Sequence, residues 1–367
     1  MTLTNYWWLL IWIAVAGGIL TWVFPQKQIK VLGKVEYRWN WLAALILASP
    51  YAIWSMNRSN FGDTEVYRQT FHDIPQSLNE LSSYLSDHTK DKGFSILTAL
   101  LKQIVGNNDK MFFLIIAVFQ ILCVVYFFRT YSANFLMCMF MFVASTDYLS
   151  WMFNGMRQFI AVGIVLLSYS LVLKKRYVWA ILFILLAATI HGSALLMIPI
   201  IFVIQGKAWN KRTLLMIVTV AFAIAYVGHF TSFLETALSE TQYSDMMTNE
   251  IWAADNGTSI LRVLFYSIPA MLAFVGKKYI DVENSPIINL CVNCALCTAV
   301  IYALSAVTSG IYIGRLPIYT TFPGYIAGVW IIDHMFMKES ARIVKSILIL
   351  SYLVFFYYQM HMAWGIL

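Results

Sequence analysis

Three polar residues in a mostly apolar stretch are the first candidates for chemistry in this sequence. Arg157, Gln158 and His191 lie within residues 154–204, where hydrophobic segments of membrane-spanning length leave little room for charge. Placing an arginine inside a membrane costs about 3 kcal/mol on insertion scales, so such a residue marks a functional site. The alternative is an arginine at a helix end whose guanidinium reaches the lipid headgroups, and for Arg157 alone both interpretations stay open.

Two further groups could handle protons or sugar hydroxyls. An imidazole titrates near neutral pH, so His191 is a candidate general base; the alternative is a histidine that caps a helix end. Ser193 either binds substrate or hydrogen-bonds the nearby backbone. Asp63 and Glu65, followed by Tyr67, could serve as a base, as acceptors for sugar hydroxyls or as metal ligands. Solvated acids on a loop are the competing interpretation.

Three arginines far apart in the sequence suit a phosphate-rich ligand: Arg157, Arg262 and Arg315. A guanidinium is always charged, and its forked donors match phosphate oxygens. In a low-dielectric cavity these side chains would stabilise the charge of a departing diphosphate, although a water-filled vestibule also holds solvated arginines. Tyr319 could stack on a sugar ring or simply lie at the membrane interface.

Several other classes of chemistry find no support. The sequence has no P-loop, dinucleotide-binding, HExxH or GxSxG motif, and no histidine or acidic residue adjoins its cysteines at metal-ligand spacing. We therefore expect neither a metal nor another cofactor.

The composition determines which kind of protein positions these residues. Of the 367 residues, 60% are hydrophobic and only 12% are charged, and the mean hydropathy is +0.70. A soluble domain of this size cannot cover its surface with so little charge. The net charge of +7 is spread over short loops rather than gathered in a basic cluster with aromatic residues, which argues against nucleic-acid binding. We expect an all-α polytopic membrane protein, with residues 1–367 forming one integral membrane domain.

Apolar runs of membrane-spanning length occur throughout the chain. They are Asn5–Phe24, Trp39–Met56, Lys110–Phe128, Ala133–Ser150, Gly155–Leu173, Thr213–Phe230, Ile260–Gly276, Pro286–Ser305, Leu316–Phe336 and Ile343–Trp364. Residues 94–105 are too few to span, so we predict a re-entrant or interfacial helix there. Residues 177–204 are too many for one upright helix and carry His191-Gly192 near their middle.

The distribution of charge decides how the chain crosses the membrane. Lys27, Lys30, Lys34 and Arg38 place the first loop in the cytoplasm under the positive-inside rule. The later basic loops are also cytoplasmic if residues 177–204 form a hairpin of two half-length helices that turns at His191-Gly192. This topology predicts about twelve transmembrane helices and two long outward-facing loops, residues 57–92 and 231–259. Their length suggests helical or lid-like elements over a cavity.

Under this topology, six polar residues from distant parts of the sequence lie at the outer ends of helices or on an outer loop. They are Asp63, Glu65, Arg157, His191, Arg262 and Arg315. We expect them to converge on one outward-facing active site or substrate cavity.

Two motifs carry a resemblance to a known family. They are Met156-Arg157-Gln158-Phe159-Ile160-Ala161 and, beyond Lys174-Lys175-Arg176 and an apolar helix, Ile190-His191-Gly192-Ser193-Ala194-Leu195. They resemble the EpsG/Wzy-like family of bacterial membrane proteins, which polymerise lipid-linked exopolysaccharide or O-antigen repeat units. Supporting segments are Gly62-Asp63-Thr64-Glu65-Val66-Tyr67, Gly93-Phe94-Ser95-Ile96-Leu97 and Gly314-Arg315-Leu316-Pro317-Ile318-Tyr319. One departure is Lys92, which stands where many relatives have an acidic residue or proline.

The resemblance, which spans roughly residues 60–325, implies a glycosyltransferase of the bacterial cytoplasmic membrane whose active site faces outward. The donor would be an oligosaccharide on undecaprenyl diphosphate and the acceptor a second lipid-linked unit, with polyprenyl diphosphate as the leaving group. Membrane lipids and a chain-length regulator are the other expected partners.

Together, the residues and the resemblance assign roles to ten side chains. His191 or Asp63 is the catalytic base; Arg157, Arg315 and Arg262 bind diphosphate; and Gln158, Glu65, Tyr67, Ser193 and Tyr319 bind substrate. A flippase or transporter is an alternative, although such proteins carry internal repeats and polar groups at the membrane midplane, and neither is clear here. A ligase that moves the glycan to another acceptor would use the same groups.

Overall fold

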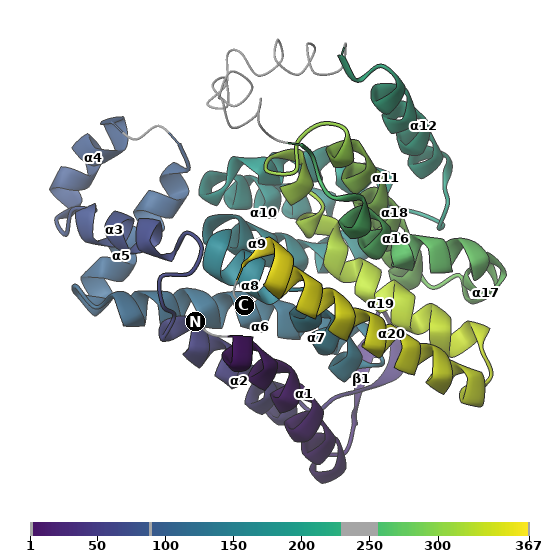
Figure 1. The fold of residues 1–367 in the computed structure, drawn as a ribbon. Coiled ribbons are helices and arrows are strands. Elements are labelled where there is room, and N and C mark those ends of the chain that lie inside the picture. The colour runs from purple at the N-terminus through teal and green to yellow at the C-terminus, as the bar shows by residue number, and fades with distance from the viewer. Residues whose placement is uncertain (1–2, 88–89, 229–255, 366–367) are drawn as a thin grey trace. The chain divides into compact units, whose positions relative to one another are not determined.

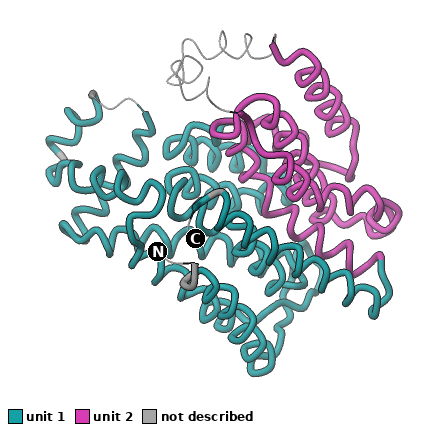
Figure 2. Tube along the Cα trace, viewed as in Figure 1, with its two compact units in different colours: residues 1–195, 336–367 teal, residues 196–335 magenta. Residues whose placement is uncertain are grey.

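Helices make up most of the computed structural model, which describes residues 3–87, 90–228 and 256–365 (Figure 1). The chain forms two compact units (Figure 2). Unit 1 comprises Met1–Leu195 with Phe336–Leu367, and unit 2 comprises Leu196–Met335. The all-α class is confirmed apart from one two-stranded hairpin in the described residues. A single membrane domain over residues 1–367 stays a prediction.

Unit 1 contains the N-terminal and C-terminal helices. Its elements are α1 (Leu3–Val23), β1 (Lys27–Val31), β2 (Lys34–Arg38), α2 (Trp41–Met56), α3 (Thr64–Asp73), α4 (Leu78–Asp87), α5 (Lys92–Val105), α6 (Asp109–Tyr131), α7 (Phe135–Ala144), α8 (Asp147–Leu149), the π-helix η1 (Ser150–Asn154), α9 (Met156–Leu173), α10 (Tyr177–Ile190), α20 (Lys338–Tyr358) and the π-helix η4 (Gln359–Ala363). Helix α6 packs against both α2 and α9, and α9 packs against α10. These contacts bury large aromatic side chains such as Phe112, Phe127 and Tyr169.

Unit 2 begins in the short 3₁₀ helix η2 (Gly192–Leu196). It continues with α11 (Met197–Val203), α12 (Lys211–Ala225), α16 (Ile260–Val275), α17 (Lys277–Glu283), α18 (Pro286–Ala306), the 3₁₀ helix η3 (Ile313–Arg315) and α19 (Ile318–Met335). Helices α16, α18 and α19 pack against one another. The amides of Asn289 and Asn293 on α18 hold the loop before α12 by accepting from the backbone N–H groups of Ala208 and Trp209, both at 3.1 Å.

The number of predicted membrane helices is not confirmed. Among the described residues, five helices are long and apolar enough to span a membrane, or up to seven if each of two bent pairs is one span. Several predicted spans form shorter helices: α2 has 16 residues and α12 has 15. At a rise of about 1.5 Å per residue, such helices fall short of a hydrocarbon core of about 30 Å.

One predicted span is broken. The run Ala133–Ser150 was expected to form a single helix, but α7 ends at Ala144 and the chain bends by 68° into Asp147–Asn154. Thr146 adopts a left-handed backbone with φ 67°, and the Ser145 hydroxyl accepts from the Asp147 N–H at 3.3 Å. Hydroxyl and carboxyl side chains that bond the nearby backbone compete with helical hydrogen bonds, which explains the break.

Residues 177–204 are interrupted at the expected place. Helix α10 ends at Ile190, and His191 is extended, with φ −153° and ψ 113°. The chain resumes as η2 and α11. The break at His191-Gly192 is confirmed, while the crossing of the membrane by both halves stays a prediction.

The predicted outer loop 57–92 is largely helical, as expected, because it contains α3 and α4. The end of α3 is held by Lys102 of α5, whose ammonium donates to the carbonyls of His72 at 2.6 Å and Ile74 at 2.7 Å. Residues 94–105 lie within α5, and their re-entrant or interfacial placement stays a prediction. The other long loop, 231–259, lies outside the described residues except for 256–259.

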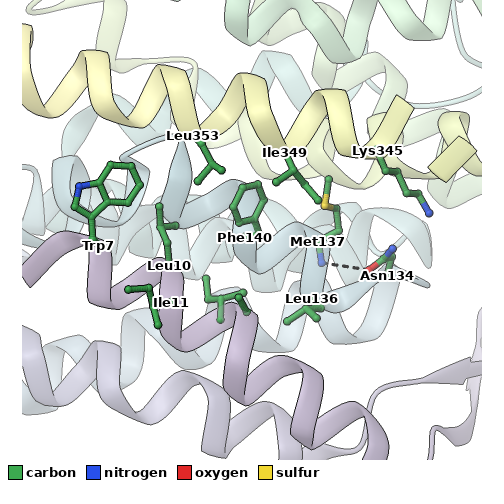
Figure 3. Close-up of a pocket in the computed structure, with 12 residues that line it drawn as sticks. Trp7, Leu10, Ile11, Asn134, Leu136, Met137, Phe140, Lys345, Ile349 and Leu353 are labelled. Atoms are coloured by element: carbon green, nitrogen blue, oxygen red, sulfur yellow. Dashed lines mark hydrogen bonds between the residues drawn. The ribbon is translucent and has the colours of Figure 1, made fainter. Parts of the chain in front are cut away.

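The basic first loop forms the β1–β2 hairpin, which was not predicted. Its last residue, Arg38, donates from Nε to the Thr130 carbonyl at 3.1 Å. Arg129 donates in return to the Trp39 carbonyl at 2.9 Å. These bonds fix the hairpin beside the end of α6. Helix α7, which follows α6, packs against α1 and α20. These three helices border an apolar groove (Figure 3).

Candidate functional site

A cavity of about 480 Å³ in unit 1 gathers several of the predicted site residues. One face of α3 and its N-cap supplies half of the lining, because the spacing of these residues places them on one side of a helix. The described lining consists of Asp63, Val66, Tyr67, Thr70 and Asp73 from this face, Tyr84 of α4, Lys90, Phe94 and Ser95 of α5, and Arg157 of α9. Charged, hydroxyl and aromatic groups thus face one space, and such convergent polar groups are typical of a ligand-binding pocket.

Arg157 lies in the first turn of α9, where the helix dipole disfavours a cation. Asp91 compensates: its Oδ2 is 3.1 Å from Nη1 of Arg157. The guanidinium carbon also lies 5.9 Å from the centre of the Phe94 ring. The Arg157 side chain nevertheless keeps 41% of its surface exposed, so the guanidinium is held in place and still accessible to a ligand.

Tyr67 joins α3 to the segment that precedes Arg157. Its hydroxyl donates to the Asn154 carbonyl at 3.1 Å. Burial raises the pKa of Tyr67, and the neighbouring Arg157 guanidinium offsets part of that rise, so the phenol stays protonated at neutral pH. Gly62 permits the close approach: its φ is +56°, and a Cβ there would lie 2.8 Å from Oδ1 of Asn154. Asp63, the next residue, is thereby fixed at the cavity.

Asp91 connects Arg157 to the turn after α10. It occupies the N-cap of α5 with a left-handed backbone, φ 52°. Its second carboxylate oxygen accepts from the Gly192 backbone N–H at 3.3 Å. Gly93 lets α5 approach α10, because a Cβ there would lie 2.6 Å from the carbonyl oxygen of Thr189. One carboxylate therefore holds both motifs of the predicted site together.

His191 directly precedes Gly192, the residue that Asp91 contacts, and it has partners of its own. Nδ1 of His191 is 2.7 Å from the Ser193 hydroxyl, which also accepts from the Gln158 amide at 3.4 Å. The three predicted residues are therefore brought together, and His191 is half-buried. Among the described residues, the cavity is bordered by Asp63 and not by His191.

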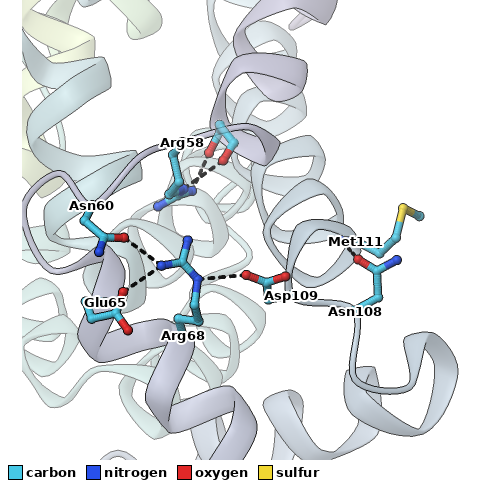
Figure 4. A network of polar contacts seen from close by, with 8 residues as sticks. Arg58, Asn60, Glu65, Arg68, Asn108, Asp109 and Met111 are labelled. Carbon is cyan, nitrogen blue, oxygen red and sulfur yellow. Dashed lines mark hydrogen bonds and ion pairs between the residues drawn. The ribbon is translucent and has the colours of Figure 1, made fainter. Parts of the chain in front are cut away.

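Glu65 is part of an ion-pair network (Figure 4), and its predicted role in substrate binding stays a prediction. Nη1 of Arg68 lies 2.6 Å from Oε2 of Glu65 and donates to Asn60 Oδ1 at 2.7 Å, while its Nε donates to Asp109 Oδ2 at 2.8 Å. The bond to Asp109 is the main reason why the pKa of Arg68 is raised. The network ties α3 to the first turn of α6, so it fixes the helix that lines the cavity.

The remaining predicted residues lie in unit 2. Arg262 is half-buried in the first turn of α16, Arg315 is exposed in η3, and Tyr319 is fully buried in α19. The segments before the two arginines pack together: the Thr258 N–H donates to the Ser305 carbonyl at 3.0 Å, and a Cβ on Gly314 would lie 2.5 Å from Oγ1 of Thr258. Convergence of these arginines with Arg157 stays a prediction.

Comparison with known proteins decides the family. The EpsG family model matches residues 40–364, nearly the whole chain. The chain belongs to the EpsG family. No curated protein and no solved structure gives a significant match. The family assignment confirms the resemblance based on the Arg157 and His191 motifs, and the match covers both units.

Sequence reasoning missed two residues whose contacts hold parts of unit 1 together in this EpsG family member. The first is Asp91, which stands one residue before Lys92, next to the position where an acidic residue was expected. The second is Arg58, whose guanidinium stacks on Phe113 and Phe153 at 4.3 and 4.6 Å and donates to the Met152 carbonyl at 2.9 Å. No local pattern distinguishes it from a solvated loop arginine, because its partners lie far away in the sequence.

Proposed function

We propose that this EpsG family protein is a polysaccharide polymerase, a membrane glycosyltransferase that joins oligosaccharide units carried on polyprenyl diphosphate. The observation that carries the proposal is the accessible Arg157 guanidinium beside Asp63 at one cavity. The family and the apolar helices support a membrane enzyme of polysaccharide synthesis. We place it in the bacterial cytoplasmic membrane with this cavity facing outward, because that orientation puts the basic loops inside.

The proposed reaction needs a base, a cationic clamp and a space for sugars. A hydroxyl of the acceptor unit attacks the anomeric carbon of the donor, and the bond between that carbon and the diphosphate oxygen breaks. The hydroxyl proton passes to the base, and the polyprenyl diphosphate leaves with the bonding electrons. Arg157 stabilises the negative charge that develops on the leaving group. We assign the same role to Arg262 and Arg315 of unit 2.

The cavity favours Asp63 as the base over His191, because Asp63 borders the space that the acceptor would enter. His191 then acts indirectly. It binds Ser193, and the adjacent Gly192 N–H binds the carboxylate that holds Arg157. Tyr67 and Tyr84 offer aromatic surface for sugar rings, and Thr70 and Ser95 offer hydroxyls. Gln158 supports Ser193 rather than lining the cavity.

The decisive experiment supplies the purified protein with a lipid-linked repeat unit and no other acceptor. A polymerase produces a ladder of longer glycans and releases polyprenyl diphosphate, one molecule for each bond formed. A single transfer to an added foreign acceptor without a ladder would identify a ligase. Movement of the substrate across vesicles without any new glycosidic bond would identify a transporter.

A further inference from the structure

Unit 1 has a second hollow, an apolar groove that shares no lining residue with the candidate site and has no role in the proposed reaction. It has a volume of about 490 Å³ and lies between α1, α7 and α20 (Figure 3). Its walls are almost wholly apolar, from Trp7 and Leu10 at one end to Phe140 and Ile349 in the middle. The stretch from Lys345 to Leu353 on α20 measures about 12 Å along the helix axis, close to the depth of one membrane leaflet.

The other end of the groove is polar. Lys345 of α20 and Asn134, the N-cap of α7, both line the groove there (Figure 3). The Asn134 side chain accepts from the Met137 N–H at 3.2 Å, which leaves its amide N–H₂ group facing away from that helix end. An apolar channel that ends at an ammonium and an amide matches a molecule with a hydrocarbon chain and an anionic head.

The surroundings of this end are strongly basic. The β1–β2 hairpin is bound to the end of α6, three residues before Asn134, and α20 begins at Lys338, seven residues before Lys345. The basic residues of these segments are Lys27, Lys30, Lys34, Arg38, Arg129, Lys338, Arg342 and Lys345, whereas the acidic ones are Glu36 and Glu339. Under the positive-inside rule, this end faces the cytoplasmic leaflet, where anionic phospholipids attract basic residues.

We propose that the groove is a binding site for an anionic phospholipid of the cytoplasmic leaflet. One acyl chain lies between α1, α7 and α20, and the phosphate contacts Lys345 and Asn134. The substrate's polyprenyl chain is the competing occupant, but its diphosphate would have to lie at the outward cavity, at the opposite end of the membrane. The exclusion of that occupant rests on the proposed function, whereas the binding of the phospholipid is measured by labelling and not by polymerisation.

The test uses the full-length protein in phosphatidylcholine nanodiscs that contain a small fraction of phosphatidylglycerol with a photoreactive group on one acyl chain. After irradiation, mass spectrometry locates the labelled peptides. We expect labelling of α1, α7 and α20 at groove residues. Lys345→Gln should lower that labelling about fivefold, the effect of removing one cation beside an anionic headgroup. Lys338→Gln is the matched comparison, because it removes the same charge from the same helix outside the groove, and it should lower the labelling less than Lys345→Gln does.

A second pair of variants tests the apolar part of the groove. Ala14 lines the groove and Val15 does not, and both lie on the exposed side of α1. Ala14→Phe should fill the groove and abolish labelling there, whereas Val15→Phe should leave it unchanged. Equal labelling by photoreactive phosphatidylcholine, equal effects within either pair of variants, or displacement of phosphatidylglycerol by polyprenyl phosphate would each overturn the assignment.

Discussion

Arg157 and Arg58 lie in the same unit but in opposite environments. Arg58 is only 5% exposed. Its guanidinium donates to the carbonyls of Ser55 and Met152 and to the Ser55 hydroxyl, and it also contacts two phenylalanine rings. Burial lowers the pKa of Arg58 to about 10. Arg157 keeps 41% of its side chain exposed and faces a cavity. The accessible arginine can bind a ligand, whereas the enclosed one can only hold the backbone.

Arg68 is intermediate between the two. It is partly exposed, with 25% of its side chain accessible, but two carboxylates neutralise it. Arg157 has one such partner among the contacts of the described residues, Asp91. The three arginines thus differ in the number of anionic partners as well as in burial, and both properties determine whether a guanidinium stays accessible to a ligand.

The largest expected effect concerns the base. Asp63→Asn should lower the rate of polymerisation by roughly 10²–10⁴-fold, the usual contribution of a general base. His191→Ala should be milder if histidine acts only through the network. The pH profile distinguishes the two residues: an imidazole base loses activity as it is protonated in mild acid, whereas a carboxylate base keeps activity to lower pH. An inactive His191→Ala variant beside an active Asp63→Asn variant would restore His191 as the base.

The second largest effect concerns Arg157, the accessible arginine, in contrast with the enclosed Arg58. Arg157→Ala should lower activity by roughly 10²–10³-fold, the cost of removing one donor to a developing anion. Lysine in its place should recover little, since an ammonium cannot make the forked contact. The protein should remain folded, because the Arg157 side chain is 41% exposed and its ion pair with Asp91 is partly screened by solvent. Glycan ladders together with thermal unfolding in detergent measure both properties, and a variant with normal ladders would remove Arg157 from the clamp.

Arg58→Ala should give the reverse result. The change leaves the carbonyls of Ser55 and Met152 buried without their donor and removes two ring contacts, so we expect a loss of about 3 kcal/mol in the free energy of unfolding. Arg68→Gln is the matched comparison: its network is partly exposed to solvent, so the loss should be about 1 kcal/mol. Equal destabilisation by the two variants would contradict the distinction between enclosed and partly exposed arginines.

The features that could be predicted from the sequence are the local ones. The low charge and long apolar runs indicated a helical membrane protein, and the polar interruption at His191-Gly192 indicated a break. The bend at Thr146 was missed, because it depends on short side-chain bonds to the backbone inside a run that remains apolar on average. The same averaging leaves the number of membrane helices unconfirmed, since an apolar run shows nothing about where its helix ends.

The candidate site could be predicted in part. Arg157, Asp63 and Tyr67 were selected correctly as neighbours of one cavity, because a charged or acidic residue beside an apolar run is conspicuous. The ion-pair network around Glu65 was not predicted, because Asp109, which shares Arg68 with Glu65, lies 44 positions after Glu65 in the sequence. Asp91 escaped notice for the same reason, since its importance comes from Arg157 and Gly192 and not from its own surroundings in the chain.

The smallest expected effect concerns Asp91, whose carboxylate fixes the direction of the Arg157 guanidinium. Replacing Asp91 tests whether Arg157 has to be held in place to act. Asp91→Ala should lower activity about tenfold, since the Arg157 guanidinium loses its fixed direction while it remains in the cavity. Asp91→Glu should recover part of the loss, and Asp91→Asn should recover less, because it keeps an acceptor for the Gly192 N–H but removes the charge. The decrease should appear in kcat more than in KM. If Asp91→Ala instead raised activity, the carboxylate would be a competitor of the diphosphate for Arg157 and not its guide.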